Sequence, residues 1–242
     1  MTPPPFFILE NLHPTLIGTP HLPKSVDIYM VNIATLELHT LDKEVIILSE
    51  EERIHAAHYA FKHLEKRYLI SRILLRRILA SYTQTLPEQL IFTPEPCGKL
   101  NLASPSFPLQ FNLSHSKDLI LYAISRSPVG IDVEFIRPLE NMDDIVNNYF
   151  SPHEILRFHS YAEKRERIEW FYEIWTSKEA YFKTSGIGLA GPFSQVERRI
   201  EQVQSEVKKG VIYEYMQGNA LPFLQYKPHQ DYVATIVCDS VR

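Results

Sequence analysis

The sequence contains little cysteine, no long hydrophobic run and no strong excess of either charge. Its two cysteines, Cys97 and Cys238, lack the spacing of a metal site and are too few for a disulfide framework, so a reducing compartment fits best. No apolar run approaches the ~20 residues that span a bilayer, and residues 1–5 lack the basic and apolar segments of a signal peptide. A formal net charge of −4 is not that of a general polyanion binder. These absences predict a cytoplasmic protein that binds neither membranes nor nucleic acid.

What remains is the composition of an ordinary globular chain, with 242 residues of which 45% are hydrophobic and 22% charged. This length allows one large domain or two small ones. Both halves follow a similar plan, in which a strand is followed by helices and then by short strands. We therefore expect two related subdomains, residues 1–126 and 127–242, although no residue-level repeat relates them. Residues 1–25 are rich in proline and predict an irregular arm.

The expected elements follow from apolar periodicity and from β-branched and aromatic content. In the first half we expect a strand at 26–33, helices at 49–59 and 64–82, extended pieces near 91–92 and 99–102, and a hairpin joining 111–113 to 119–124. In the second half we expect a strand at 129–135, helices at 142–149, 152–159 and 162–185, and strands near 194–200, 207–216, 222–227 and 232–238. A capping box at Ser49 and Glu52 marks the first helix start.

The longest predicted helix is uninterrupted by glycine or proline and ends before Gly186. Trp175, Glu179 and Lys183 recur at every fourth residue and therefore share one of its faces. Taken alone, Glu179 and Lys183 are more typical of an exposed ion pair that contributes a few tenths of a kcal/mol.

Two carboxylates lie on one face of the predicted strand 129–135. Asp132 and Glu134 are two residues apart, so they point to the same side, while their apolar neighbours point into a core. Two such carboxylates repel each other unless a cation lies between them, and a small set of hard oxygen ligands suits Mg²⁺. A solvated strand face with two surface acids is an equally good interpretation of this pair alone.

Ser114 and His115 suggest a nucleophile and its base, but adjacent strand residues face opposite sides and cannot form a dyad. We interpret them as hydrogen-bond donors to an anion, with a polar turn as the alternative. Lys99 follows a proline-rich loop from which it could reach a phosphate, although a lone loop lysine is usually solvated. Glu154 lies in the first turn of a predicted helix, where a carboxylate ordinarily stabilises the helix dipole.

Three motifs occur together in a fixed order, at residues 111–116, 129–134 and 175–183. In this combination the sequence closely resembles the 4′-phosphopantetheinyl transferases, and more specifically the long, monomeric class named after the surfactin-synthetase activator. The resemblance implies a mixed α/β (α+β) fold, a pseudo-dimer of two similar subdomains. Each subdomain would pack a small, mostly antiparallel sheet against a long helix, with the active site at their interface.

The resemblance also implies an activity and its partners. The phosphopantetheine arm of coenzyme A would be transferred to a serine of an apo acyl or peptidyl carrier protein, as a holo-acyl-carrier-protein synthase does, with release of adenosine 3′,5′-bisphosphate. The carrier would belong to fatty acid, polyketide or peptide synthesis, and the enzyme would act as a monomer with Mg²⁺ or Mn²⁺.

Family roles fall on particular residues of this chain. The metal ligands would be Asp132, Glu134 and Glu179. Contacts to the phosphates of coenzyme A would come from Lys183, Ser114 and His115, and a contact to its nucleotide end from Lys99. The base that accepts the serine proton would be Glu179 or Glu154.

The chain departs from the family pattern where the first predicted helix starts. The family often carries basic residues there for the 3′-phosphate of coenzyme A, whereas this chain has Glu50, Glu51 and Glu52. Arg67 on the second helix is the basic residue that we assign to that phosphate.

Two other functions remain open from the residues. A metal-dependent phosphodiesterase or nuclease also combines acids with a lysine, although it usually places them on neighbouring strands, and a net-acidic chain is a poor duplex binder. A coenzyme A-binding module without chemistry would not need the set Asp132, Glu134, Glu179 and Lys183.

Overall fold

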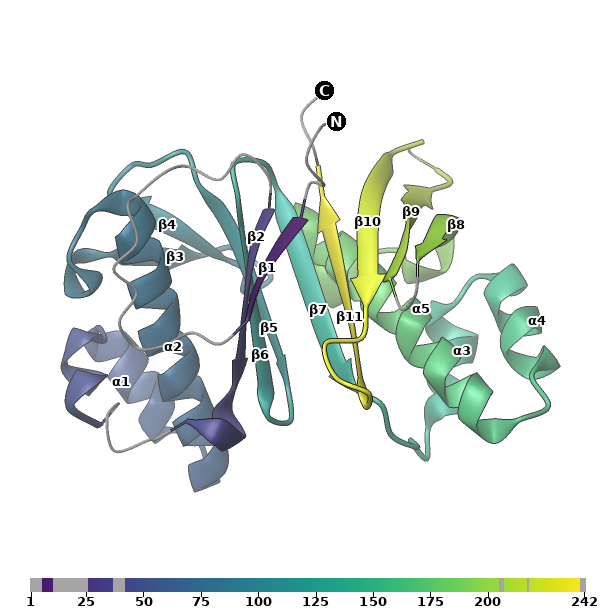
Figure 1. Ribbon diagram of the computed structural model, residues 1–242, viewed down its shortest axis with the longest axis horizontal. Helices are drawn as coiled ribbons and strands as arrows, with labels where there is room; N and C mark the ends of the chain where they lie inside the picture. Colours follow the sequence, from purple (N-terminus) through teal and green to yellow (C-terminus); the bar gives the residue numbers. More distant parts are fainter. Residues whose placement is uncertain (1–5, 11–25, 37–41, 205–206, 217, 240–242) are drawn as a thin grey trace.

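The computed structural model describes residues 6–10, 26–36, 42–204, 207–216 and 218–239. Within these ranges two α/β halves lie side by side, each with a β-sheet and its own helices (Figure 1). One sheet has the strand order β1-β2-β6-β5, and the other has the order β7-β11-β10-β9-β8. The small, mostly antiparallel sheets and the two long helices confirm the predicted fold class.

The N-terminal half contains the first sheet, the β3–β4 hairpin and two helices. Its elements are β1 (Phe6–Glu10), β2 (Val26–Asn32), α1 (Glu50–Ala57), α2 (Lys62–Thr83), β3 (Ile91–Pro94), β4 (Leu100–Ser104), β5 (Gln110–Ser116) and β6 (Leu119–Ser125). The irregular arm that we predicted for residues 1–25 is wrong for Phe6–Glu10, which pairs in parallel with β2. The rest of that stretch lies outside the described residues.

The C-terminal half repeats this plan with a larger sheet. Its elements are β7 (Val129–Phe135), α3 (Met142–Tyr149), α4 (Pro152–Ser160), α5 (Lys164–Ser185), β8 (Val196–Gln204), β9 (Val207–Glu214), β10 (Ala220–Tyr226) and β11 (Tyr232–Cys238). The antiparallel order β7-β11-β10 matches β2-β6-β5, and α5 matches α2 in its length of 22 residues. We propose a boundary between residues 126 and 127, in the connection from β6 to β7.

Local sequence sets the ends of three helices. Ser49 and Glu52 form the predicted capping box of α1, and Ser151 and Glu154 form a second one on α4. Gly186 ends α5 with a φ of +76°, a left-handed conformation that costs a glycine little. No helix in the described ranges has both the length and the apolar character to cross a membrane.

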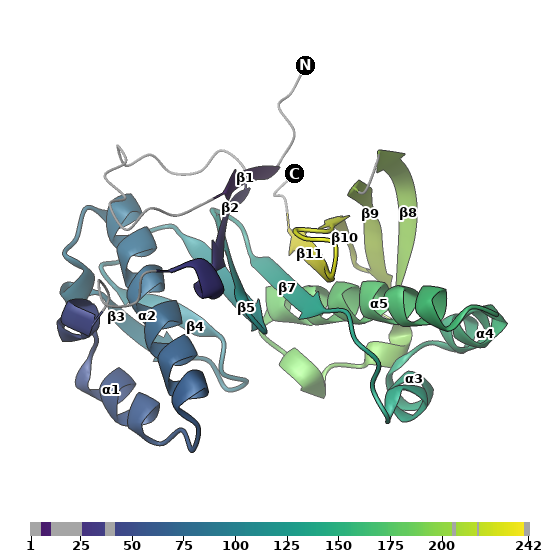
Figure 2. The same cartoon turned by 60° about the horizontal axis from the view of Figure 1, so that its bottom comes forward.

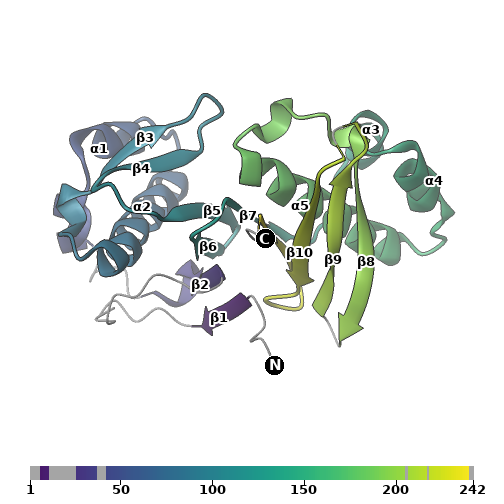
Figure 3. The same cartoon turned by 90° about the horizontal axis from the view of Figure 1, so that it is seen from above.

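The two sheets pack face to face and share a hydrophobic core. Strands β2 and β6 contribute Val26, Ile28, Leu119, Leu121 and Ala123 to this core, and strands β7 and β11 contribute Val129, Ile131, Val133, Ala234 and Ile236. Full burial of a Val, Leu or Ile side chain contributes about 1.5–3 kcal/mol, so this shared core joins the halves strongly. The resulting layers are α2, the first sheet, the second sheet and α5 (Figures 2 and 3).

Candidate active site

Strands β5 and β7 meet edge to edge between the two halves, and we call this contact the seam. Each is an edge strand of its own sheet, so its outward main-chain groups need partners. Alternate side chains of β5 accept hydrogen bonds from β7 main-chain N–H groups: Asn112 from Ile131 at 2.9 Å, Ser114 from Val133 at 3.3 Å and Ser116 from Phe135 at 3.0 Å. Side chains thus replace the main-chain ladder that would otherwise join two strands.

The same serines hold the two carboxylates of β7. As predicted, Asp132 and Glu134 lie on one side of the strand, and the hydroxyls of Ser114 and Ser116 each donate to one of them at 2.8 Å. Asp132 is 3% exposed, and its Oδ2 atom is buried without a hydrogen-bond partner among the described residues. An unpaired buried carboxylate oxygen is costly unless a further cation or donor satisfies it.

Helix α5 brings Lys183 and Glu179 to these carboxylates because Gly130 lets it approach β7 closely. A Cβ at Gly130 would lie 2.0 Å from the carbonyl oxygen of Ala180, so no larger residue fits there. The Lys183 ammonium donates to Asp132 at 2.6 Å and to Ser114 at 3.3 Å. A cavity of about 300 Å³ results, lined by Leu113, Ser114, His115, Asp132, Glu134, Trp175, Glu179 and Lys183.

The charges in this cavity perturb one another. Burial, and then repulsion by Asp132, raises the pKa of Glu134 to about 7. Burial also raises the pKa of Glu179 to about 7, against the attraction of Lys183. Burial alone would lower the pKa of Lys183, but the attraction of Asp132 and Glu179 is stronger and raises it. The site therefore favours additional positive charge.

These residues fit a divalent cation in their chemistry. Three carboxylates line the cavity, and the unpaired Oδ2 of Asp132 is the kind of oxygen that such an ion binds. Within the described ranges, no group of three or more His, Cys, Asp and Glu side chains is already arranged around a metal position. The ammonium of Lys183 lies against Asp132 instead.

His115 and Arg67 lie close enough to influence each other. The His115 ring is exposed at the cavity, but the protein around it desolvates it, and this lowers its pKa together with the charge of Arg67. Arg67 is partly buried on α2. The positive charge of Arg67 therefore acts on a ring that lines the cavity, an arrangement that suits an anion.

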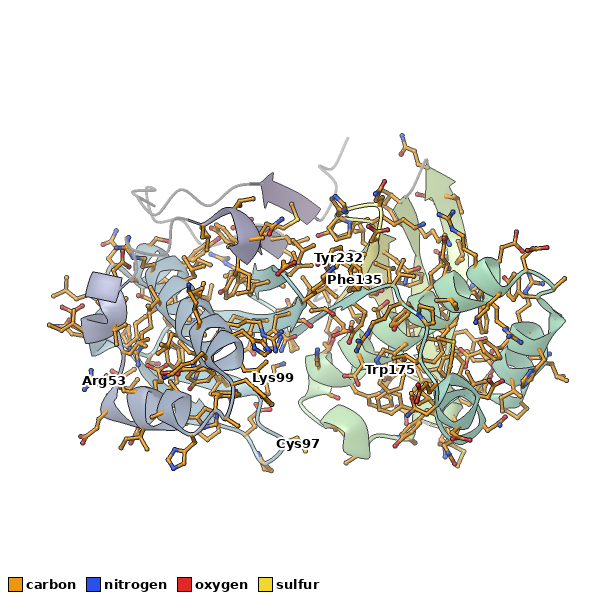
Figure 4. All side chains as sticks on the ribbon, turned by 90° about the horizontal axis from the view of Figure 1, so that it is seen from below. Arg53, Cys97, Lys99, Phe135, Trp175 and Tyr232 are labelled. Carbon is orange, nitrogen blue, oxygen red and sulfur yellow. The ribbon has the colours of Figure 1, made fainter. Side chains whose placement is uncertain are left out.

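The ammonium of Lys99 points away from this cavity. It donates to the main-chain carbonyls of Lys183 at 2.8 Å, Thr184 at 2.9 Å and Val129 at 3.4 Å. The lysine thus caps the C-terminus of α5 from the other half of the molecule. The side chain also lines a second cavity of about 380 Å³, together with Cys97, Gly98, Glu179, Gly186 and other residues (Figure 4).

Like Arg67, Glu154 is a predicted site residue that lines neither cavity. Its carboxylate is 7% exposed, caps α4 through the Ser151 main-chain N–H and forms an ion pair of 2.8 Å with Lys178. Lys178 also donates to the carbonyls of Phe193 and Val196. The geometry therefore favours a role for Glu154 in fixing α4 and β8 against α5.

The structure adds two residues that our reading of the sequence had not singled out. Ser116 holds Glu134, and Asn112 supplies a further rung of the seam. The alternation of polar side chains at 112, 114 and 116 was a usable signal, because alternate strand residues share a face. The partner of that face was not predictable from β5 alone.

Comparison with known proteins identifies the family. A model of the 4′-phosphopantetheinyl transferase superfamily matches residues 128–237, and a model of the 4′-phosphopantetheinyl transferase N-terminal region matches residues 37–127. The chain belongs to the 4′-phosphopantetheinyl transferases. The two matches together cover both halves of the molecule, including β5, β7 and α5.

Curated 4′-phosphopantetheinyl transferases are similar to this chain. HetI of Nostoc sp. is 35% identical over 147 residues, which are 59% of this chain and 61% of HetI. The psf-1 protein of Bacillus pumilus is 33% identical over 156 residues, 64% of this chain and 65% of psf-1. Sfp of Bacillus subtilis is 28% identical over 156 residues, 64% of this chain and 67% of Sfp. The chain thus spans less than two thirds of the length of HetI and psf-1.

Proposed function

We propose that this protein transfers the 4′-phosphopantetheine group of coenzyme A to a serine of an apo acyl or peptidyl carrier protein. The observation that carries the proposal is the convergence of Asp132, Glu134, Glu179 and Lys183 on one cavity at the seam. In a member of this transferase family, a cavity with carboxylates and an ammonium suits a diphosphate substrate. The comparisons give no support to a nuclease or to a binding module without chemistry.

The reaction exchanges one phosphorus–oxygen bond for another. The carrier serine oxygen bonds to the phosphorus that bears the pantetheine arm, while the bond from that phosphorus to the bridging diphosphate oxygen breaks. Adenosine 3′,5′-bisphosphate leaves with the bond electrons. The barrier is lowered mainly by positioning and by positive charge around the phosphoryl oxygens.

Lys183 supplies fixed positive charge to the diphosphate. Its raised pKa keeps it an ammonium, and its bond to Asp132 directs it into the cavity. His115 and Arg67 are assigned to phosphate binding, most specifically to the 3′-phosphate. Ser114 acts through Asp132, since its hydroxyl proton is directed at that carboxylate. The alkyl stem of Lys99 lines the second cavity, which we assign to the nucleotide end of coenzyme A, while its ammonium caps α5.

Asp132, Glu134 and Glu179 would hold the divalent cation, Mg²⁺ or Mn²⁺. When bound, such an ion neutralises diphosphate charge and orients the substrate. The three ligands come from β7 and α5, which Gly130 keeps in contact.

Glu179 is the base that we propose for the serine proton, taken directly or through a water. Its carboxylate lines the cavity proposed for the diphosphate, where the attacking serine must approach. Glu154 was the other candidate, and its carboxylate is engaged by Lys178 outside the cavity.

We further propose that the chain acts as a monomer, because both sides of the cavity belong to one chain. A cytoplasmic location also remains our proposal, and the free thiols of Cys97 and Cys238 are compatible with it. The carrier would serve fatty acid, polyketide or peptide synthesis.

One assay tests the activity. The protein is incubated with coenzyme A, Mg²⁺ and a purified apo-carrier, and the mass of the carrier is measured by intact-protein mass spectrometry. We expect the mass gain of one phosphopantetheine, and a loss of at least about a hundredfold in rate for Asp132→Ala with the fold retained. The remote variant Ser81→Ala, whose hydroxyl donates to the carbonyl of Ile78 on the same helix, is the matched control. No mass gain with any of several carriers, or an Asp132→Ala variant as fast as wild type, would contradict the proposal.

A further inference from the structure

Ser116 connects the two halves at the position of Glu134. Its Oγ atom accepts the main-chain N–H of Phe135 at 3.0 Å and donates its proton to Glu134 Oε2 at 2.8 Å. A serine hydroxyl has a single proton, so this proton is committed to the carboxylate. Ser116 lies at the end of β5 in the N-terminal half, and Glu134 lies on β7 in the C-terminal half.

The three rungs of the seam differ in what they hold. Asn112 accepts an N–H but donates to no carboxylate among the described residues. Asp132, held by Ser114, also receives the ammonium of Lys183. For Glu134, the hydroxyl of Ser116 is the one direct hydrogen bond found among the described residues. The orientation of Glu134 therefore depends on Ser116 more than that of Asp132 depends on Ser114.

Contacts beside Ser116 fix its own position. The ammonium of Lys117, in the β5–β6 turn, lies 3.9 Å from the centroid of the Phe135 ring. The main-chain N–H of Asp118 donates to the Tyr232 hydroxyl at 3.4 Å, and the Tyr232 ring packs edge-on against Phe135 at 5.1 Å between centroids (Figure 4). The turn after Ser116 is thus pinned to the C-terminal half, so the hydroxyl has little freedom to move away from Glu134.

We propose that Ser116 is a positioning residue that orients Glu134 for a divalent cation across the boundary between the two halves. The N-terminal half then contributes to metal affinity although none of the assigned ligands belongs to it. A hydrogen bond that fixes a carboxylate before the ion arrives lowers the cost of binding, and loss of such a bond typically reduces metal affinity 10- to 100-fold. The inference rests on the metal site of the proposed function.

The test measures binding of Mn²⁺ alone, by loss of the electron paramagnetic resonance signal of the free ion. The variants are Ser116→Ala, Ser116→Thr, Asp132→Ala and the remote control Ser81→Ala. We expect the Mn²⁺ dissociation constant to rise about 10- to 100-fold in Ser116→Ala and to return close to wild type in Ser116→Thr, which keeps the hydroxyl. Ser81→Ala should bind as wild type does.

A second comparison separates positioning from general destabilisation. Asn112→Ala removes a rung of the seam without removing a donor to a carboxylate, so it should lower the unfolding temperature but leave Mn²⁺ affinity nearly unchanged. If Ser116→Ala does not fold, Ser116→Cys is measured instead. The cysteine side chain is similar in size but is a weaker hydrogen-bond donor, so Mn²⁺ affinity should fall by a smaller factor.

The outcomes distinguish this inference from the function on which it rests. Wild-type Mn²⁺ affinity in the alanine or cysteine variant overturns the role of Ser116, as does an equal loss in Asn112→Ala. If wild type binds no Mn²⁺, or binds it equally well after Asp132→Ala, the metal site itself is wrong and the positioning role falls with it.

Discussion

The ammonium of Lys99 donates a hydrogen bond to the main-chain carbonyl of Lys183, 2.8 Å away in the other half of the molecule. Lys183 is the residue whose side chain reaches Asp132. One lysine thus stabilises the helix end from which the other enters the site. A cation at a helix C-terminus is favourable, and the bonds to Thr184 and Val129 strengthen this arrangement.

Lys99→Met should therefore destabilise the protein and disturb the site together. The loss of charged hydrogen bonds to α5 should reduce the free energy of unfolding by about 2 kcal/mol. Coenzyme A should also bind more weakly, because the last turn of α5 loses its cap. Denaturant unfolding and coenzyme A titration check both effects, with the exposed Lys66→Met as control. A variant with wild-type stability and weaker coenzyme A binding would show that the ammonium contacts the nucleotide instead.

Glu179→Gln should leave stability nearly unchanged and slow the transfer greatly. The amide keeps the size of the side chain but cannot accept the serine proton or hold a cation as a carboxylate does. Rates measured per folded molecule, beside thermal unfolding curves, give the result. An unfolded variant with full specific activity in its folded fraction would instead favour the simple ion pair between Glu179 and Lys183.

Glu154→Gln should give the opposite pattern. Breaking the buried pair with Lys178 leaves an uncompensated ammonium, which typically costs about 3–5 kcal/mol, while the chemistry in the cavity continues. Thermal unfolding curves and transfer rates per folded molecule check both effects. A stable but inactive Glu154→Gln variant would assign the proton transfer to Glu154.

His115→Ala should weaken coenzyme A about 10- to 100-fold but barely affect dephospho-coenzyme A, which lacks the 3′-phosphate. A charge-assisted contact to a phosphate contributes about 1.5–3 kcal/mol. Arg67→Ala should act in the same way, since the charge of Arg67 acts on the same ring. Both ligands are titrated against wild type and both variants. Equal losses for the two ligands would remove His115 from the 3′-phosphate.

The ion pairs of Glu173 should make the free energy of unfolding depend on pH. Burial would raise its pKa, but Arg198 and Lys208 outweigh this effect and hold the pKa below the ordinary value. A depressed folded-state pKa contributes stability above the ordinary value of about 4.5 and loses it as the pH falls through the lower folded-state value. Wild type should exceed Glu173→Gln in unfolding free energy at pH 7, and the difference should shrink below about pH 4. A difference that does not change with pH would contradict the assignment.

Periodic and capped segments were predictable from the sequence, because their signals are local. The capping box of Ser49 and Glu52 forms as expected, and so does the hairpin from β5 to β6, with its turn at Lys117. The shared side of Asp132 and Glu134 follows from strand alternation alone. Their approach to Lys183 was suggested by family resemblance, since no local rule places a strand against a particular face of a helix.

The remaining features depend on contacts between distant segments. Phe6–Glu10 forms a strand only because β2 accepts it in parallel, a pairing with no short-range turn signal. Lys99 turns to α5 because the β3–β4 hairpin lies at the helix end, a position set by the packing of the two halves. Glu154 is engaged by Lys178, which is on another helix. The side chains were visible in the sequence, but their partners were not.

The core shared by the two sheets has a consequence for how the molecule comes apart. A break between residues 126 and 127 would leave each fragment with an apolar sheet face in water and an edge strand whose N–H or side-chain partners belong to the other fragment. Neither fragment should therefore be stably folded by itself. The chain should denature in one cooperative transition, and separately expressed fragments should fold only when mixed.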